Sequence, residues 1–509
     1  MTSFVSTAPL FDAPRFSPVF IPTLQSLGLS DDERATIAKL QMKGWRERGL
    51  LELTDAYYRG AQLITNLGIA IPPELAGLRT VVGWPRIAVD PYVERLFLES
   101  FRLPGATDSD QDLTDIWIAA GMDAEQSLAY TDALAMGRGY LTIGSAYEDG
   151  DPPQICVESP LNMSVVWDLR TRKPKEALQS YWMEGRRCAA LYVKGATIQI
   201  GEDDNGAWEV IDRDEHGFEV LPIVRIANRP RSNNRDGASE ITPELMSIVD
   251  ATCRTLLGLE VSRELYSVPQ KVLLGASESD FVNADGTAKS GFSTYISRIW
   301  AIEPDEEGNV PEIKQMTPYD PSVFTKLVDM YASQAAGILG SPPQDLGLYT
   351  DGNPISAEAA QVSEGRRDRR ARRMQATFGV PMIETMQISL RFINGGELPD
   401  EYKRLYADWS DPQIPNIAGT ADALTKYAKE GMIPPTSDVT LKRAGFNVIE
   451  RARLEADRKV DAGAQVLREL AESEQVKLAR ATNTVDNNIN PNGPVKPNDR
   501  AAGNGSVSQ

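Results

Sequence analysis

The densest group of chemically active side chains is a run of six arginines between residues 366 and 373. Guanidinium groups bind phosphate and carboxylate, so the run predicts either contact with DNA or ion pairing. Arginines spread over roughly two helical turns face most sides of a helix, and the formal net charge of the chain is −19. We therefore favour ion pairs, within the chain or with a second subunit, over DNA contact for Arg366, Arg367, Arg369, Arg370, Arg372 and Arg373.

The remaining candidates for chemistry are weak. His216 is the single histidine, which leaves no histidine pair for zinc and a poor basis for a catalytic triad. The segment from Asp212 begins like a calcium loop, but Ile223 stands where a bidentate glutamate is required. The acidic cluster at 303–307 could chelate a metal for nuclease chemistry, although a solvated turn is favoured. With no phosphate-binding G-x-x-x-x-G-K-[ST] motif, we expect no catalytic, cofactor or metal site.

Composition limits the class of protein. A pI of about 4.7 and a hydrophobic fraction of 41% predict a soluble chain that buries a core but does not coat nucleic acid, which basic surfaces do. An acidic channel through which DNA slides stays compatible with this charge. No stretch is long and apolar enough for a membrane span. The three cysteines, expected to be free and buried in a reducing compartment, are Cys156, Cys188 and Cys253.

Two long helices with apolar faces organise the chain. The first begins near Ile241 and fades at about Tyr266. The second follows Pro321, carries Leu327 and Ile338 on its apolar face, and ends at Gly340, after which the chain is too rich in proline and glycine for a helix. Between them, 271–274 and 293–302 have the composition of strands. We expect a small β-rich lobe carried on two helical stalks.

Helices and strands also fill the flanking regions. Residues 30–33 form a capping box that begins a helix ending at Gly60, with a break at Gly49 as an open alternative. Short strands every ten or so residues up to 228 predict an antiparallel sheet. A third long helix carries the arginine run and should kink at Pro381.

The segment Asn353–Ala359, followed by the arginine-rich helix and Phe378-Gly-Val-Pro-Met382, resembles the portal proteins of tailed bacteriophages. The segments 67–75 and 78–86 resemble the same family, in the branch common among phages of actinobacteria. The order of helix, β lobe, helix, loop and bent helix is similar to that of portals. This resemblance implies an elongated α+β portal fold with a wing, a two-helix stem, a β-rich clip and a C-terminal helical crown.

The resemblance and the element pattern together divide the chain into nine parts. These are an N-terminal arm (1–29) with four prolines and no regular period, a wing of helices and antiparallel sheet (30–238), a first stem helix (239–265), a clip (266–317), a second stem helix (318–340), a tunnel loop (341–355), a bent wing helix with a linker (356–412), a crown (413–478) and a disordered tail (479–509).

The implied function is structural. Portal subunits form a ring of about twelve copies at one capsid vertex, the channel for DNA packaging and ejection. The implied partners are double-stranded DNA passing non-specifically, terminase, a head-completion or adaptor protein, and the major capsid and scaffold proteins, with no membrane. The implied locations are the virion and, during assembly, the host cytoplasm. Two alternatives stay open: another oligomeric head or neck protein, and a metal-dependent nuclease.

The resemblance also names candidate site residues. Asp250 and Glu260, on the first stem helix, are expected to line the channel. The tunnel loop should project toward DNA, although local packing of its apolar side chains is an open alternative. The loop residues are Gln344, Asp345, Leu346, Leu348, Tyr349 and Thr350.

Overall fold

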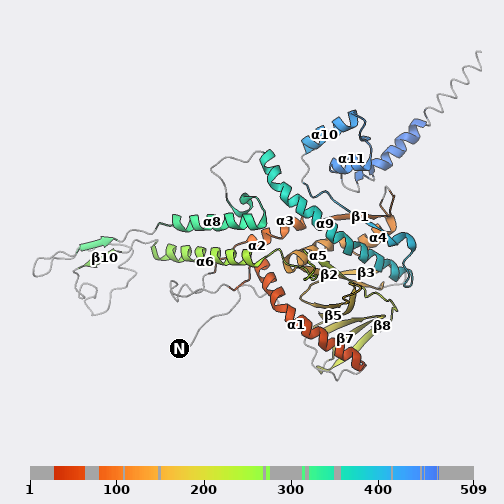
Figure 1. The fold of residues 1–509 in the computed structure, drawn as a ribbon, viewed down its shortest axis with the longest axis horizontal. Coiled ribbons are helices and arrows are strands. Elements are labelled where there is room, and N and C mark those ends of the chain that lie inside the picture. Colours follow the sequence, from red (N-terminus) through yellow and green to blue (C-terminus); the bar gives the residue numbers. More distant parts are fainter. Residues whose placement is uncertain are drawn as a thin grey trace, which may run out of the picture. The chain divides into compact units, whose positions relative to one another are not determined.

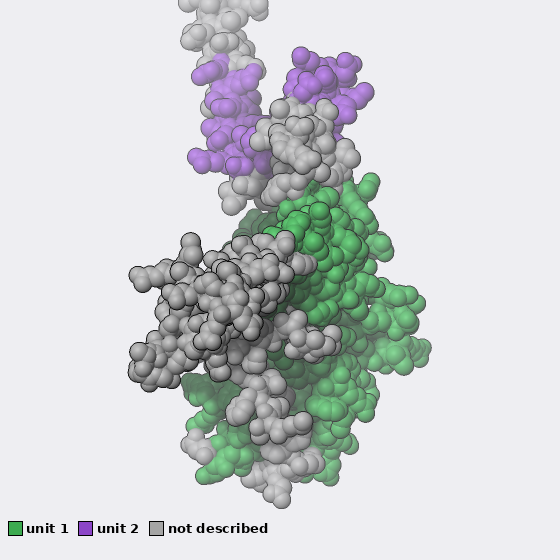
Figure 2. Space-filling model, turned by 90° about the vertical axis from the view of Figure 1, so that its left-hand side faces the viewer, with its two compact units in different colours: residues 1–413 green, residues 414–509 purple. Residues whose placement is uncertain are grey.

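The computed structural model describes residues 28–63, 79–106, 109–146, 151–203, 205–266, 271–274, 312–315, 320–348, 357–413, 417–446, 450–451, 453–466 and 468. The chain divides into two compact units, residues 1–413 and 414–509 (Figure 2). Helices and sheets are mixed, which confirms the α+β prediction at that level. No helix in the described ranges is long and apolar enough to cross a bilayer.

Helix α1 (Asp31–Arg59) is set by local sequence signals. The Ser30 side chain accepts from the Glu33 amide, and Glu33 accepts from the Ser30 amide, as in a capping box. The helix ends at Gly60, whose φ of 71° suits a residue without a Cβ. It continues through Gly49 without a break. Packing of Ile37 and Leu40 against a sheet helps to explain this continuity.

Two antiparallel sheets form the centre of the first unit, where the sequence predicted one. Helix α1 covers one face of the larger sheet through Leu178 and Leu191. The opposite face packs through Val165 and Tyr192 against side chains of the smaller sheet. The larger sheet has the order β4 (Met163–Trp167), β5 (Pro174–Met183), β6 (Arg186–Val193), β7 (Ala196–Glu202), β8 (Trp208–Asp214); the smaller has the order β3 (Gln154–Glu158), β2 (Arg138–Gly144), β9 (Ile223–Ala227).

Helix α5 (Met122–Met136) lies against strand β2. A Cβ at Gly139 would lie 2.6 Å from the carbonyl oxygen of Ala129, so glycine permits this close approach. The sequence predicted a short strand before Leu103, and β1 (Leu98–Arg102) confirms it, whereas α3 (Asp90–Val93) is shorter than the helix predicted at 91–97. Helices α2 (Trp84–Ile87) and α4 (Gln111–Ala119) were not predicted. Neither was β12 (Tyr406–Trp409), which pairs with β1 and replaces part of the predicted linker.

Helices α6 (Pro243–Tyr266) and α8 (Ser322–Leu339) run side by side, and strand β10 (Lys271–Leu274) lies beyond their ends (Figure 1). Strand β10 pairs antiparallel with β11 (Glu312–Gln315). The strand predicted at 271–274 is therefore confirmed, and β11 was missed. The strand predicted at 293–302 lies outside the described residues.

Helix α9 (Ala357–Ile393) is continuous over 37 residues and contains Pro381. A 3₁₀ turn, η3 (Pro343–Leu346), follows α8, although the local prolines and glycine had argued against any helix there. A second turn, η4 (Asp400–Lys403), precedes β12. In the second unit, α10 (Ile417–Lys429) and α11 (Asp438–Arg443) occupy two of the predicted helices, and residues 453–466 are helical.

Candidate channel and assembly surfaces

The paired helices approach closely where α6 carries a glycine. A Cβ built at Gly258 would lie 3.2 Å from Cε1 of Phe324, near the start of α8. One face of α8 is buried, through Ala332, Ala335, Ala336 and Leu339. A second face leaves large apolar side chains exposed, including two, Leu327 and Ile338, that the sequence assigned to the buried stripe. The exposed set is Val323, Leu327, Met330 and Ile338.

The two acidic residues predicted on α6 have different surroundings. Asp250 accepts a hydrogen bond of 2.8 Å from the Tyr57 hydroxyl of α1. Burial, followed by this bond, raises the pKa of Tyr57. Glu260 pairs with Arg263 at 2.9 Å, and its side chain is 37% exposed. Glu260 therefore pairs within its own helix, while Asp250 links α6 to α1.

The segment after α8 packs locally up to Leu348. Leu346 is buried, and Leu348 packs against the main core of the first unit. The local-packing alternative therefore holds for both leucines. Asp345 pairs with Arg367 of α9. Tyr349 and Thr350 lie outside the described residues.

Arg367 is the most deeply buried member of the arginine run, with a side chain 5% exposed. It pairs with Asp345 in η3 and donates to Glu364 at 3.2 Å. Glu364 also accepts from Arg95 at 2.7 Å. These contacts fasten the beginning of α9 to the turn after α8 and to the segment that follows α3.

Arg370 points inward from the next turn. It pairs with buried Glu240, and its Nη1 donates to the Tyr92 hydroxyl at 3.1 Å. Burial lowers the pKa of Arg370, but the opposing effects of Glu240 and Tyr92 raise it overall. The contact therefore connects α9 to the segment that leads into α6.

The other four arginines face solvent. Arg372 pairs with Asp411 at 3.2 Å. Arg366, Arg369 and Arg373 form no ion pair within the described part of the chain. The run thus divides into two inward-facing, ion-paired arginines, Arg367 and Arg370, and four exposed ones, because consecutive residues of a helix face different sides.

The sequence did not identify the residues that pair with this part of α9. Arg370 pairs with Glu240, and Asp368, which lies within the arginine run, is 3.5 Å from Arg95. Both partners are more than 100 residues away in the sequence. Asp368 was visible inside the run, but its burial depends on tertiary packing. The single local signal was the (i, i+3) spacing of Glu364 and Arg367.

The residues considered as weaker candidates for catalysis or metal binding take part in local packing and hydrogen bonds. His216 accepts a hydrogen bond of 3.1 Å from the Phe218 amide through Nδ1, and burial lowers its pKa. Asp212 and Asp214 belong to strand β8. In the described ranges, no three His, Cys, Asp or Glu residues are grouped to hold a metal ion. Cys188 and Cys253 are buried as predicted, whereas Cys156 is exposed.

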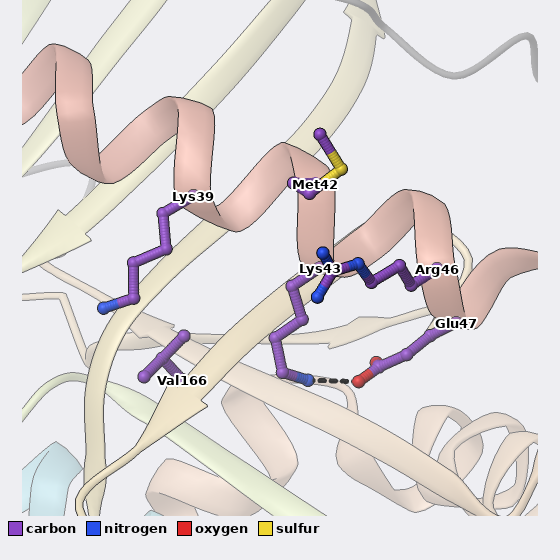
Figure 3. A pocket seen from close by; sticks show the side chains of 6 residues that line it. All are labelled: Lys39, Met42, Lys43, Arg46, Glu47 and Val166. Carbon is purple, nitrogen blue, oxygen red and sulfur yellow. Dashed lines mark hydrogen bonds and ion pairs between the residues drawn. The ribbon is translucent and has the colours of Figure 1, made fainter.

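A surface hollow lies beside α1 and is lined mainly by charged side chains (Figure 3). Lys39 pairs with Glu176 at 2.7 Å, and Lys43 pairs with Glu47. These pairs neutralise both lysines, whereas Arg46 of the same lining forms no ion pair with the described residues. Its full lining is Lys39, Met42, Lys43, Arg46, Glu47 and Val166.

Comparison with known proteins gives consistent matches. Residues 37–444 match the family model described as phage portal protein, SPP1 Gp6-like. The portal protein of Mycobacterium phage D29 is 34% identical over 413 residues, which cover 79% of this chain and 84% of the relative. The portal protein of Mycobacterium phage L5 is 33% identical over 438 residues, covering 84% and 89%.

Two solved structures of a gene transfer agent are also similar. A chain of the virion of the native particle covers 75% of this chain and 89% of its own length, at a TM-score of 0.39 and 15% identity. A chain of the neck of the native particle, computed with C12 symmetry, covers 78% and 94%, at a TM-score of 0.39 and 14% identity.

Proposed function

Because this chain belongs to the SPP1 Gp6-like family of phage portal proteins, we propose that its α6–α8 pair lines the channel of a ring-shaped portal. The observation that carries this proposal is the pair itself: two long helices packed side by side, with the β10–β11 sheet beyond their ends (Figure 1). In the ring they act as the stem, and the β10–β11 region acts as the clip.

The ring contains about twelve copies and is closed by a heterologous interface, in which different patches of neighbouring copies meet. The exposed apolar face of α8 supports this arrangement. Val323, Leu327 and Met330 lie on successive turns and are 36–45% exposed, and contact with a neighbouring stem would remove them from water. Arg366, Arg369 and Arg373 contribute to contacts between copies, where acidic side chains are abundant.

The remaining parts take the roles implied by the family. Residues 30–238 together with α9 form the wing, and residues 413–478 form the crown. Because Leu346 and Leu348 pack against the core, the part of the tunnel loop that projects toward DNA begins at Tyr349. Glu260 and Asp250 present negative charge to DNA, which passes without base readout. The ring binds terminase, a head-completion protein, and capsid and scaffold proteins. It performs no catalysis, assembles in the host cytoplasm and is retained in the virion.

Native mass spectrometry with negative-stain imaging of the purified chain tests the ring. We expect particles of about twelve copies with a central hole. A compact dimer would contradict the proposal. Incubation with supercoiled plasmid and Mg²⁺ or Mn²⁺ tests the nuclease alternative, and we expect no cleavage.

Charge reversal tests the channel. Glu260→Lys should slow DNA packaging because a ring of new cations would attract phosphate. Glu244→Lys, a change of the same charge at an exposed position in the first turn of the same helix, is the control for net charge. Equal packaging rates in the two variants would show that Glu260 does not line the channel.

A further inference from the structure

The larger sheet of the first unit carries a basic turn at one edge. Residues 168–175 lead from the edge strand β4 into β5 and contain four cations and one acid. The acid, Asp168, is used within the turn, because its carboxylate accepts from the Arg170 amide at 2.8 Å and from the Thr171 amide at 2.6 Å. Leu169, in the same turn, is 83% exposed. We call residues 168–175 the basic tip.

Two arginines of the basic tip have no counter-ion among the described residues. Lys173 and Lys175 pair with glutamates of α9 and β5, but Arg170 and Arg172 are exposed and form no such ion pair. The φ of Arg172 is +64°, a left-handed conformation that costs roughly 1 kcal/mol or more outside glycine. Because strain of this kind is most common at functional sites, it favours a binding role for the turn.

The opposite edge of the same sheet is acidic. Residues 209–219, which contain most of the edge strand β8 and the loop after it, hold five acids and one arginine. The arginine, Arg213, pairs with α1 at 2.9 Å and is not available to these acids. We call residues 209–219 the acidic edge. Three of its acids form no ion pair with any described residue, namely Asp212, Asp214 and Glu215.

The basic tip and the acidic edge lie at the same end of the sheet. One row of paired residues crosses all five strands, and the tip and the loop after β8 both follow this row. Neighbouring strands are about 4.8 Å apart, so four spacings separate the two edges by roughly 19 Å. This exceeds the screening length of about 8 Å at physiological ionic strength, so the two charges of one copy cannot neutralise each other. The row is Val165, Ala177, Tyr192, Thr197 and Asp214.

We propose that the basic tip of one copy docks on the acidic edge of the next copy. This inference rests on the proposed ring, whose closure requires two different patches to meet head to tail. The patches are opposite in charge, and each also exposes an apolar side chain, Leu169 in the tip and Ile211 in the edge, which is 50% exposed. An apolar contact inside a charged rim is typical of protein interfaces.

Opposite charges at the two edges serve orientation more than affinity. Complementary charge selects the correct pairing and rejects wrong ones, so this contact fixes the head-to-tail arrangement while burial of apolar surface supplies attraction. Charged edge strands also prevent uncontrolled pairing between sheets. That protective role does not require the two edges to carry opposite charge.

Charge reversal in the full chain tests the contact. Arg170→Glu with Arg172→Glu, and separately Asp212→Lys with Glu215→Lys, should each lower the ring fraction in mass photometry at least about tenfold, because like charges then face each other. An equal mixture of the two variants should restore rings, since each reversed surface finds its opposite on the other variant. Failure of the mixture to form rings would overturn the proposal.

Net charge is separated from the contact in two ways. The Asp212→Lys with Glu215→Lys variant is less negative overall, so a gain of rings would mean that general repulsion decides assembly and would overturn the proposal. Arg231→Glu with Arg235→Glu alters exposed arginines between β9 and α6 and changes net charge as the tip variant does. Its ring fraction should be nearly unchanged, and a loss equal to that of the tip variant would also overturn the proposal.

Disulfide trapping distinguishes this contact from the ring itself. In a Cys156→Ser background, which removes the exposed native thiol, Leu169→Cys with Ile211→Cys should join copies under mild oxidation. Within one copy these positions are roughly 19 Å apart, whereas a disulfide needs Cα atoms within about 7 Å. Leu169→Cys with Ile118→Cys on α4 is the control. Cross-linked copies without rings would support the contact and overturn the proposed ring, whereas rings without cross-links would overturn the contact alone.

Discussion

Arg367 carries a larger share of stability than its neighbours in the run, because its charge is buried. Arg367→Met leaves Asp345 and Glu364, whose side chains are 31% and 27% exposed, without this cation. Removing one partner of a buried ion pair costs about 3–5 kcal/mol, and partial exposure of the acids reduces this to about 2–4 kcal/mol. Urea unfolding followed by tryptophan fluorescence measures the loss, since all eight tryptophans lie in residues 1–413.

Arg369→Met is the matched control for this measurement. Arg369 is exposed and lies two residues further along the same helix, so the free energy of unfolding should change by less than about 0.5 kcal/mol. Similar losses in the two variants would mean that the buried ion pairs of Arg367 contribute no net stability.

Asp132 gives a prediction about pH. Burial, and secondly the nearby charge of Asp55, raise the pKa of Asp132 from 3.8 to about 7. The folded state therefore holds a proton that the unfolded state has lost, and stability falls as pH rises between these values. Asp132→Asn should stabilise the chain by on the order of 2 kcal/mol at about pH 8 and by little at about pH 4.

Thermal unfolding at the two pH values checks this dependence. Asp123→Asn removes a negative charge from an exposed position on the same helix, so it controls for overall charge. A gain of equal size at both pH values would show that the benefit of asparagine is unrelated to protonation of Asp132.

The arginine run illustrates which site features a sequence can reveal. Its charge and helical setting were sufficient to predict ion pairing. They could not identify Arg367 and Arg370 as the inward pair, because Asp345 and Glu240 are brought to them by the paths of other segments. Leu346 shows the same limit, since its burial depends on a core built by distant helices.

At the scale of elements, two glycines of the α6–α8 pair lead to opposite predictions. Gly258→Leu places a side chain where Phe324 already lies, 3.2 Å from the new Cβ. Overpacking of this kind costs about 1–3 kcal/mol. Gly337→Leu on α8 meets no atom within 4 Å, and replacing a helical glycine gains up to about 1 kcal/mol.

Urea unfolding of both variants tests whether the helices depend on this contact. A destabilised Gly258→Leu variant beside a neutral or stabilised Gly337→Leu variant is expected. Equal effects would indicate that helix propensity, and not the close approach of α6 and α8, decides the stability of this helix pair.

Long elements were predicted better than short ones for a physical reason. Helices such as α1 and α8 carry repeated apolar spacing and end at Gly60 and Gly340, whose signals are local. Strand β12 instead depends on pairing with β1, about 300 residues earlier in the chain. The separation into two sheets likewise depends on long-range packing that alternation alone does not specify.

At the scale of the whole molecule, the net charge of −19 per copy opposes assembly. Copies of like charge repel when they are brought together in a ring, while burial of the exposed apolar face of α8 favours association. Ring formation should therefore reflect a balance between a salt-sensitive repulsion and an apolar attraction that salt does not weaken.

This balance predicts that salt promotes the ring. Raising NaCl from about 0.05 to 0.5 M shortens the screening length from roughly 14 to 4 Å, so the ring fraction measured by mass photometry should increase. Leu327→Ser with Met330→Ser on α8 should reduce that fraction at every salt concentration, whereas the same change at Ile118 and Leu128 should not. Rings that dissociate as salt is added would instead show that ion pairs, such as those open to Arg366, Arg369 and Arg373, hold the copies together.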